Sequence, residues 1–387
     1  DALSGQSEFF YDPYLAEHQP RAHAVYRRLR EEAPVYHHPE RGIWAISRFE
    51  DVWNATLDLE TLSTEGIEEM QTLLPMLNFM DPPRHDRLRA LVSRAFTFRR
   101  VGEMEGRVRG VANELLDALE GKDRCEFVRE FAEPLPGRII AEMIGVPPER
   151  RETFLSHTRC MLTTDPSKTI TQTIEEPSKR IYAEFALLLD ERRRKPTSDL
   201  MSALVAAEID GEKLADEEIL GFCYQLIVAG NDTTTSLIGN GLVLFLQHPD
   251  QRALLVREPA RIPNAIEEVL RYEPPAQALP RQTRKPFTLH GRTVPVDQRV
   301  LLVWAAANLD EREFEDPERF DVTRKITRHL SFGHGVHTCA GMHLVRQEAE
   351  VLIAAWLRHV PAFELGHRTR KLSNMVSSWA TLAITVG

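Results

Sequence analysis

The amino-acid sequence predicts a mainly α-helical protein with smaller β-sheets folded into it. First, helical periodicity dominates from Met104 to Glu208. Second, a helix of about 30 residues is predicted from Asp216, a good N-cap, to about Gln247. Helices usually have about 11–12 residues, so this one would cross the whole molecule. Third, alternating apolar residues are confined to short segments, as expected for small sheets.

Composition and charge exclude several classes of protein. The chain has 387 residues, 42% hydrophobic and 27% charged, so it is neither low-complexity nor largely disordered. Its net charge of −10 repels nucleic acid and anionic membranes, although it allows a local basic patch. No apolar run approaches the ~18–20 residues that span a bilayer, and no signal peptide is visible. Scattered cysteines without CxxC spacing argue against disulfides or a zinc ribbon and predict a reducing, cytoplasmic setting: Cys125, Cys160, Cys223 and Cys339.

The N-terminal part alternates between helices and short strands. Apolar periodicity predicts a helix over Arg21–Glu32 that ends at Ala33-Pro34. Short apolar runs around Pro39–Gly42 predict a hairpin over Val35–Ser47. A short helix is predicted next, over Phe49–Leu59. The stretch Glu60–Asp81 has no clean period, and within it Leu73–Met80 is unusually apolar for a loop. A basic helix follows over His85–Phe96.

Two polar breaks interrupt the helical middle of the chain, at Thr163–Lys179 and at Lys195–Asp199. Beyond the long helix, helical patterns recur at Pro249–Arg257, Pro259–Tyr272 and Gly341–His359. The remaining segments predict strands with turns, a charged irregular stretch, and terminal strands: Ala278–Val303, Leu309–Arg328 and Phe363–Val386.

A glycine-rich turn carries the strongest candidate ligand. It reads Leu330-Ser-Phe-Gly-His-Gly-Val-His-Thr-Cys339-Ala-Gly341 and leads directly into the last predicted helix. Cys339 therefore lies at a helix N-terminus, where unpaired backbone N–H groups lower the pKa of a thiol and can hold a thiolate. A thiolate in such a loop is a ready metal ligand. For a lone cysteine, however, a small buried side chain in a glycine turn is the more common outcome.

The whole turn resembles the haem-binding loop of the cytochrome P-450 family, Phe-Gly-x-Gly-x-(His or Arg)-x-Cys-x-Gly. In that family the cysteine thiolate is the axial ligand of the haem iron and favours cleavage of the O–O bond. The resemblance implies that Cys339 binds the iron of a haem b. Every fixed position of the pattern is filled: Phe332, Gly333, Gly335, His337, Cys339 and Gly341.

A polar cluster interrupts the apolar centre of the long predicted helix, at Gly230-Asn-Asp232-Thr233-Thr-Thr235. Glycine costs a helix roughly 1 kcal/mol relative to alanine, and a threonine hydroxyl can donate to the carbonyl four residues earlier and bend the helix. The cluster marks either a functional site or a break between two helices at Gly230-Asn231. It resembles the family's (Ala/Gly)-Gly-x-(Asp/Glu)-Thr pattern, which implies that Asp232 and Thr233 handle protons at bound oxygen.

Glu268 and Arg271 lie three residues apart on a helix that ends at Pro274-Pro275. Alone, such a pair is usually a solvated surface contact. It resembles the family's Glu-x-x-Arg, whose third partner, an arginine in a Pro-Glu-Arg-Phe segment, is matched by Arg319. The resemblance implies that these three residues form a buried structural network that supports the cysteine loop.

Four basic residues match the positions at which the family binds the two haem propionates: His85, Arg89, Arg281 and His337. The first two are four residues apart and share a helix face, which alone would usually be a solvated face. The resemblance implies that all four hold carboxylates, which need cationic partners when they are partly buried. One departure is Thr283, where bacterial relatives often have alanine, so Arg284 is an alternative to Arg281.

Together these motifs imply the family's fold, a mostly helical triangular prism, as a single domain over residues 1–387 that resembles the bacterial soluble branch. Its β-rich portion is expected at residues 1–60, 280–325 and 361–387. The implied reaction is monooxygenation, in which one oxygen atom of O₂ is inserted into an apolar small molecule. No flavin or iron–sulfur module is visible, so electrons are expected from a separate ferredoxin or flavodoxin. The alternatives are a peroxide-driven haem oxygenase and a haem-thiolate sensor or carrier without turnover.

The substrate pocket is expected along segments that are far apart in the chain: Leu73–Phe79, Leu226 with Ala229, Ala276–Leu279 and Asn374–Ser378. Most of these side chains are apolar, which suits a lipid-like, terpenoid, steroid or macrolide-sized substrate, but suits a protein core equally well. The residues expected to line the pocket are Leu77, Phe79, Leu226, Ala229, Gln277 and Val376.

Overall fold

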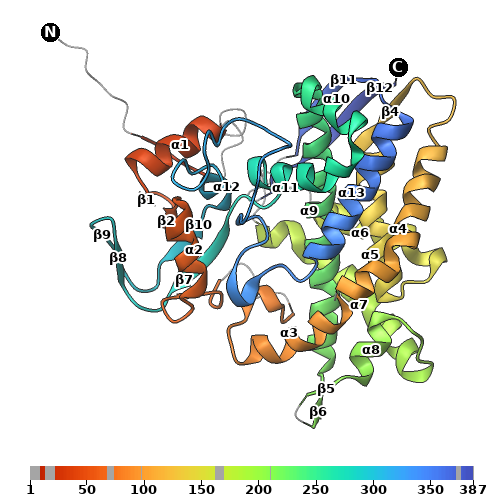
Figure 1. Ribbon diagram of the computed structural model, residues 1–387. Coiled ribbons are helices and arrows are strands. Elements are labelled where there is room, and N and C mark those ends of the chain that lie inside the picture. The colour runs from red at the N-terminus through yellow and green to blue at the C-terminus, as the bar shows by residue number, and fades with distance from the viewer. Residues whose placement is uncertain are drawn as a thin grey trace.

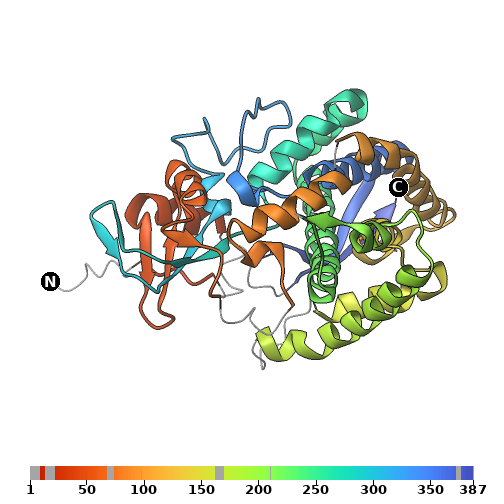
Figure 2. The same ribbon diagram turned by 90° about the horizontal axis from the view of Figure 1, so that it is seen from below.

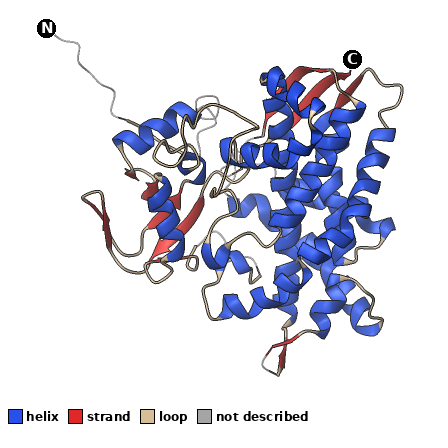
Figure 3. Ribbon diagram, viewed as in Figure 1, coloured by secondary structure: helices blue, strands red, loops and turns tan. Residues whose placement is uncertain are grey.

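The computed structural model describes residues 9–13, 22–67, 74–96, 98–161, 170–209, 211–371 and 376–386. Figure 1 shows a β-rich portion on one side and a larger helical portion on the other, and the view from below in Figure 2 separates them in the same way. Figure 3 shows that helices make up most of the described chain and that the strands are confined to small sheets. The predicted class, mainly helical with smaller sheets, is confirmed.

The β-rich portion is built around a five-stranded sheet. In spatial order its strands are β1 (Val35–His38), β2 (Ile43–Ile46), β10 (Arg299–Leu302), β7 (Leu279–Thr283) and β3 (Leu62–Ser63), and a separate hairpin joins β8 (Phe287–Leu289) to β9 (Arg292–Val294). The predicted hairpin is confirmed: β1 and β2 are antiparallel, and Gly42 between them has the positive φ (+61°) that glycine adopts readily. β2 pairs with β10 in parallel, so a segment near the N-terminus and a segment in the last quarter of the chain share one sheet.

Three short helices pack on the five-stranded sheet and the rest form the helical portion. Those on the sheet are α1 (Ala22–Glu32), α2 (Phe49–Leu57) and α12 (Trp304–Ala307). The helical portion contains α3 (Arg84–Ala95), α4 (Phe98–Asp117), α5 (Pro134–Ile144), α6 (Pro148–Met161), α7 (Ile170–Arg194), α8 (Leu200–Ala206), α9 (Asp216–Gln247), α10 (Pro249–Arg257), α11 (Ile262–Tyr272) and α13 (Met342–His359). Single turns of 3-10 or π helix are η3 (Leu77–Phe79), η4 (Val128–Ala132), η5 (Pro259–Arg261) and η6 (Gly335–His337).

The long helix α9 is continuous and runs through the helical portion (Figure 1). The alternative of two helices broken at Gly230-Asn231 is therefore wrong. At Gly230 the neighbouring helix is close: a Cβ at this position would lie 2.5 Å from Cδ1 of Ile140 on α5, so a larger residue would require the Ile140 side chain to shift. The predicted N-cap is off by one residue: Ala215 occupies that position, and Asp216 is the first residue of the helix.

The polar break predicted at Thr163–Lys179 is wrong for its second half. The helix α7 begins at Ile170, and the residues just before it lie outside the described chain. Pro177 lies within this helix, where it removes one backbone hydrogen bond. The neighbouring Ser178 hydroxyl forms a hydrogen bond with the hydroxyl of Tyr224 on α9. Ser178, one of the polar residues that suggested a break, is therefore used in a tertiary contact, which periodicity does not reveal.

Residues 361–387, expected in the same β-rich portion, contribute instead to a separate sheet on the helical side of the molecule (Figure 1). Its order is β11 (Phe363–Arg370), β12 (Trp379–Val386) and β4 (Arg124–Glu126). The alternating pattern predicted the two terminal strands, but the third strand of this sheet, β4, comes from a distant part of the chain. A small hairpin of β5 (Glu208–Ile209) and β6 (Glu212–Lys213) precedes α9.

The largest apolar core is formed by α4, α5, α7, α9, α11 and α13, and it extends to the sheet of β11, β12 and β4. Two smaller cores lie on the faces of the five-stranded sheet. Among the described helices, none has the length and apolar character needed to cross a membrane. The single-domain organisation stays a prediction.

Candidate functional site

The conformation of the cysteine loop depends on two glycines with positive φ. Gly333 (φ +68°) and Gly335 (φ +71°) adopt backbone conformations that other residues rarely adopt. At Gly335 a Cβ would also lie 2.9 Å from the Leu57 side chain on α2. The N–H of Cys339 donates to the carbonyl of Phe332 at 2.8 Å and closes the loop just before α13.

Opposing effects act on the Cys339 thiol. Burial raises its pKa, whereas the backbone N–H groups of Gly341 and Met342 at the start of α13, and the guanidinium of Arg89, lower it. Burial is the largest effect, and the pKa is raised overall. The helix N-terminus therefore lowers the pKa of the thiol as expected, but burial outweighs this effect. A metal cation at the sulfur would reverse this balance, because it stabilises the thiolate directly.

All four predicted propionate-binding residues lie near the cysteine loop. The ring centroids of His85 and His337 are 4.3 Å apart, and Arg281 acts electrostatically on His337. Within the described residues, Nε of Arg281 and Nε2 of His337 are buried without a hydrogen-bond partner. Burial lowers the pKa of Arg281 to about 10, and burial together with His85 lowers that of His337 to about 3. Buried polar nitrogens without partners fit a bound group that carries carboxylates, as haem does.

The fourth predicted residue, Arg89, lies on α3. Burial lowers the pKa of Arg89 and Cys339 raises it, so the guanidinium is close enough to act on the sulfur. The alternative Arg284 is half-exposed and donates to Ser63 and Glu65. Arg281 is only 3% exposed, and its Nε has no hydrogen-bond partner in the described part of the chain, so it fits an anion-binding role better than Arg284 does.

The predicted acid and alcohol lie near the middle of α9. The Thr233 hydroxyl donates to the carbonyl of Ala229 at 2.5 Å, the contact to the residue four positions earlier that the sequence predicts. Asp232 is 7% exposed, and its Oδ1 accepts a hydrogen bond from Nζ of Lys371 at 2.8 Å. No sequence pattern reveals Lys371, because it follows β11, 139 residues away from Asp232.

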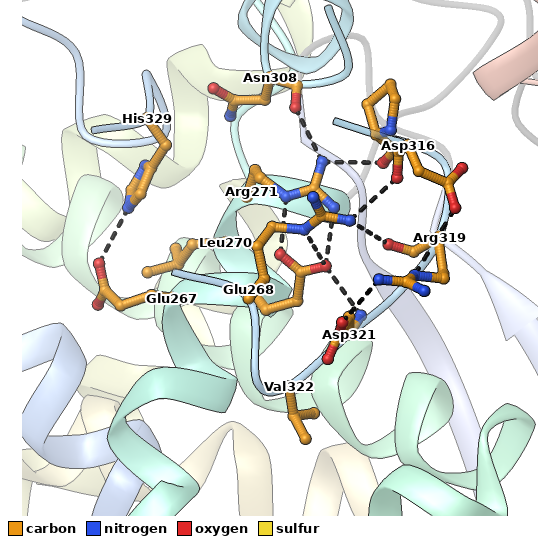
Figure 4. Close-up of polar contacts among 12 residues, drawn as sticks. Glu267, Glu268, Leu270, Arg271, Asn308, Asp316, Arg319, Asp321, Val322 and His329 are labelled. Carbon is orange, nitrogen blue, oxygen red and sulfur yellow. Dashed lines mark hydrogen bonds and ion pairs between the residues drawn. The ribbon is translucent and has the colours of Figure 1, made fainter. Parts of the chain in front are cut away.

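Figure 4 shows the predicted buried pair on α11. Nε and Nη2 of Arg271 donate to the two carboxylate oxygens of Glu268 at 2.7 and 2.8 Å, and both side chains are fully buried. The prediction for Arg319 is wrong, because its side chain is 64% exposed and pairs with surface aspartates. Arg324 replaces it, with Nε 3.3 Å from Glu268. The chain turns after the Pro-Glu-Arg-Phe segment, so that Arg324 also donates to the carbonyl of Arg319.

The expected pocket segments are partly brought together. Leu77 is buried, and Phe79 and Leu226 pack against the same core. Val376 pairs with Ala276 through an isolated β-bridge, which joins two of the expected segments. Three residues of those segments lie outside the described chain: Leu73, Asn374 and Met375.

Polar contacts hold two parts of the expected pocket. The side chain of Gln277 accepts a hydrogen bond from the Tyr26 hydroxyl at 2.7 Å, which ties it to α1. Gln225 on α9 accepts from the N–H of Leu77 at 2.6 Å and donates to the Asn78 side chain at 2.9 Å. The sequence analysis did not predict Gln225, because a search for apolar residues passes over a polar side chain that binds the segment of Leu77 and Asn78.

Comparison with known proteins places these features in a family. Residues 157–378 match the family model of cytochrome P-450. Cytochrome P-450 123 of Mycobacterium tuberculosis is 37% identical over 400 residues, which cover 99% of this chain and 98% of that protein. The vitamin D(3) 25-hydroxylase of Pseudonocardia autotrophica is 35% identical over 381 residues, or 94% of each protein. The structure of cytochrome P-450 CYP109Q5 from Chondromyces apiculatus has a TM-score of 0.90 at 37% identity, with 97% of this chain and 98% of that chain covered.

The fold and the cysteine loop therefore define a haem-iron monooxygenase. The chain belongs to the cytochrome P-450 family, and the resemblance inferred from its motifs is confirmed. The expected fold of that family is also confirmed, and the relatives named above are bacterial. As a member of this family, the protein is an oxidoreductase that uses haem iron and acts on a small-molecule substrate.

Proposed function

We propose that Cys339 binds the iron of a haem b as a thiolate, and that four basic residues hold the two propionates: His85, Arg89, Arg281 and His337. The observation that carries this proposal is a pair of buried nitrogens next to the cysteine loop, on Arg281 and His337, for which the described residues provide no hydrogen-bond partner. When bound, the haem supplies the redox chemistry that activates O₂ for insertion into the substrate. The protein supplies the sulfur ligand, cationic partners for the carboxylates, and a site from which water is excluded.

We propose further that Thr233 and Asp232 hold and move the protons that the reaction consumes. The Thr233 hydroxyl is a donor whose only protein acceptor among the described residues is the carbonyl of Ala229, and it can rotate to donate to a neighbouring oxygen instead. Asp232 is nearly buried beside it, where a carboxyl group can act as a general acid. The presence of this pair favours a monooxygenase over a sensor, a carrier or a peroxide-driven oxygenase.

The proposed substrate is an apolar molecule of lipid or steroid size that lies along α9. Support comes from the apolar side chains Leu77, Phe79, Leu226 and Val376. It also comes from solved relatives: CYP109E1 of Bacillus megaterium, 31% and 30% identical to this chain, has been solved in complex with corticosterone and with testosterone. Type I spectral titration with steroids and fatty acids tests this part of the proposal.

The proposed electron donor is a separate ferredoxin or flavodoxin with its reductase, in the cytoplasm. The proposal rests on the residues of this chain, among which no flavin or iron–sulfur motif is recognised. Turnover with the reductase chain is therefore expected, and turnover with NADH or NADPH alone is not. Turnover at a normal enzymatic rate with peroxide alone would favour the peroxide-driven alternative.

The ligand assignment is tested with the reduced protein and carbon monoxide. A cysteine thiolate produces a strongly red-shifted Soret band, and Cys339→His should abolish that band. Cys125→Ser is the matched control, because Cys125 is buried in β4 and lies outside the loop. A spectrum of the unmutated protein like that of a histidine-ligated globin would contradict the assignment.

A further inference from the structure

The helix α11 carries two adjacent carboxylates that point to different sides (Figure 4). Glu268 belongs to the buried network with Arg271. Glu267 instead reaches the segment that enters the cysteine loop: its Oε2 lies 3.1 Å from Nε2 of His329, whose side chain is 5% exposed. The Glu-x-x-Arg motif assigns no role to Glu267.

The hydrogen-bond pattern of the His329 ring is defined by the backbone next to it. The N–H of Ser331 donates to Nδ1 at 3.1 Å, so Nδ1 is an acceptor. The hydrogen of the ring is therefore on Nε2 and is donated to Glu267. The ring centroids of His329 and Phe332 are 5.8 Å apart, and Phe332 opens the cysteine loop. Glu267 thus anchors the entry of the loop.

The same carboxylate holds the helix that leaves the loop. Nε and Nη2 of Arg346 on α13 donate to Oε1 and Oε2 of Glu267 at 2.6 and 3.0 Å, as a bidentate pair. The guanidinium carbon of Arg346 lies 4.5 Å from the centre of the Phe332 ring, in a cation–π contact. One carboxylate therefore binds elements on both sides of Cys339.

We propose that Glu267 is a positioning residue that clamps both ends of the cysteine loop and so fixes the Cys339 sulfur, and the charge of Arg346, relative to the bound iron. The inference rests on the proposed role of Cys339 as the ligand. Phe332 contacts both partners of Glu267 and accepts the hydrogen bond of the Cys339 N–H. Movement of either end is thereby transmitted to the sulfur through one hydrogen bond.

The clamp is ionised at neutral pH. Burial raises the pKa of Glu267, but the hydrogen bonds from His329 and Arg346 and the positive charge of Arg346 outweigh it and hold this pKa below its usual value. The carboxylate therefore keeps its negative charge across the pH range in which the holoenzyme can be studied.

The test compares three variants of the holoenzyme. E267Q keeps the shape of the side chain but removes its charge, so the reduction potential of the iron should shift to more positive values. Part of the reduced carbon monoxide complex of E267Q should also lose the red-shifted band of thiolate ligation. R346K keeps the positive charge but cannot form the bidentate pair, so this variant should also lose part of the red-shifted band. If E267Q does not fold, R346K alone tests the proposal.

E350Q is the matched control. Glu350 lies on α13 close enough to interact electrostatically with Glu267 and Arg346, yet it forms no hydrogen bond or ion pair within the described part of the chain. It should keep the wild-type spectrum. The clamp is refuted if E267Q and R346K both keep the wild-type band and potential, or if E350Q changes them as much as E267Q does. A missing thiolate band in the unmutated protein would refute the ligand assignment itself, and the clamp with it.

Discussion

At the scale of single residues, buried nitrogens without hydrogen-bond partners destabilise the fold, and a bound group that accepts their hydrogen bonds removes this destabilisation. Arg281 is almost completely buried, and its Nε has no partner among the residues described. An unsatisfied buried donor costs about 1–3 kcal/mol, and more when it is charged. A propionate that accepts this hydrogen bond would recover that free energy. We therefore expect haem to stabilise the fold through Arg281 as well as through the iron ligand.

Thr233→Ala should uncouple the reaction without weakening substrate binding. Its hydroxyl donates to the Ala229 carbonyl, which already accepts within the helix, so the variant should fold normally. Loss of one positioned proton donor typically costs about 10²–10⁴-fold in the assisted step. The variant should still consume NAD(P)H but divert much of the flux into peroxide. The measurement is product formed per NAD(P)H consumed, with peroxide yield; unchanged coupling would mean that Thr233 serves packing alone.

The variant Lys371→Met should slow the proton delivery in which Asp232 is proposed to take part. Removing the ammonium leaves a nearly buried carboxylate without its ion-pair partner. A hydrogen bond to a charged group is worth about 1.5–3 kcal/mol, which corresponds to roughly 10- to 100-fold in the proton-dependent rate.

Two further variants control this test. Lys371→Arg keeps the cation and should restore most of the coupling. Lys285→Met removes an exposed pair with Glu60 and should change nothing. If Lys371→Met forms as much product per NAD(P)H consumed as the unmutated protein, the contact with Asp232 has no part in proton delivery.

Residues were predictable where their partners are close in the sequence. Cys339 and His337 lie in one loop, and Glu268 and Arg271 in one helical turn, so spacing and family resemblance locate them. Lys371 is 139 residues from its partner, and no local pattern records that contact.

At the scale of elements, the position of α9 depends on close approach to its neighbours. A Cβ on Gly221 would lie 2.1 Å from the carbonyl oxygen of Pro75, which belongs to the backbone of the segment before η3. Backbone cannot move aside as the end of a side chain can. Gly221 therefore determines how closely α9 packs against one of the expected pocket segments.

Gly221→Ala should destabilise the protein by about 1–3 kcal/mol, because the new methyl group forces α9 and the Pro75 segment apart. Gly241→Ala in the same helix is the matched control. Its Cβ would meet only ordinary contacts at 3.6–3.7 Å, so the higher helix propensity of alanine should leave stability unchanged or increase it by up to about 1 kcal/mol. Denaturant unfolding of both holoenzymes measures the difference, and equal effects would contradict this account.

The elements were predicted best where periodicity and tertiary structure agree. The hairpin of β1 and β2, α9 and α13 have bounds close to those expected. The start of α7 was missed because Pro177 and polar residues suggest a break that tertiary contacts override. Arg319 was assigned to the buried network because the motif records an arginine but not the turn that exposes it.

At the scale of the whole molecule, α13 contains a buried acid that has no ion-pair partner among the described residues. Glu348 is 1% exposed, and its Oε1 has no hydrogen-bond partner within the described chain. Burial raises the pKa of Glu348 to about 8. Its carboxyl group is therefore mainly protonated at neutral pH in the folded protein but ionised in the unfolded chain.

Glu348 should make global stability fall as the pH rises. Because its folded-state pKa is above the unfolded value, its contribution is present below about pH 4.5 and is lost as the pH rises through about 8. Glu348→Gln removes this dependence. Its stability relative to wild type should increase by up to about 1.4 kcal/mol per pH unit within that window. Denaturant unfolding at several pH values measures this, and parallel curves for the two proteins would show that Glu348 does not titrate as argued.

The two carboxylates of α11 also limit how the length of the chain can change. Successive residues in a helix are rotated by about 100°, and Glu267 and Glu268 use that rotation to serve different partners. A single-residue insertion or deletion before them would turn Glu267 away from Arg346 on α13 and would turn the Glu268–Arg271 pair away from Arg324. The turn between β8 and β9, at His290 and Gly291, carries no carboxylate, and among the described residues its side chains make one ion pair, from the partly exposed His290 to Asp51 on α2. Length variation should therefore be tolerated in that turn and lethal to the fold in α11.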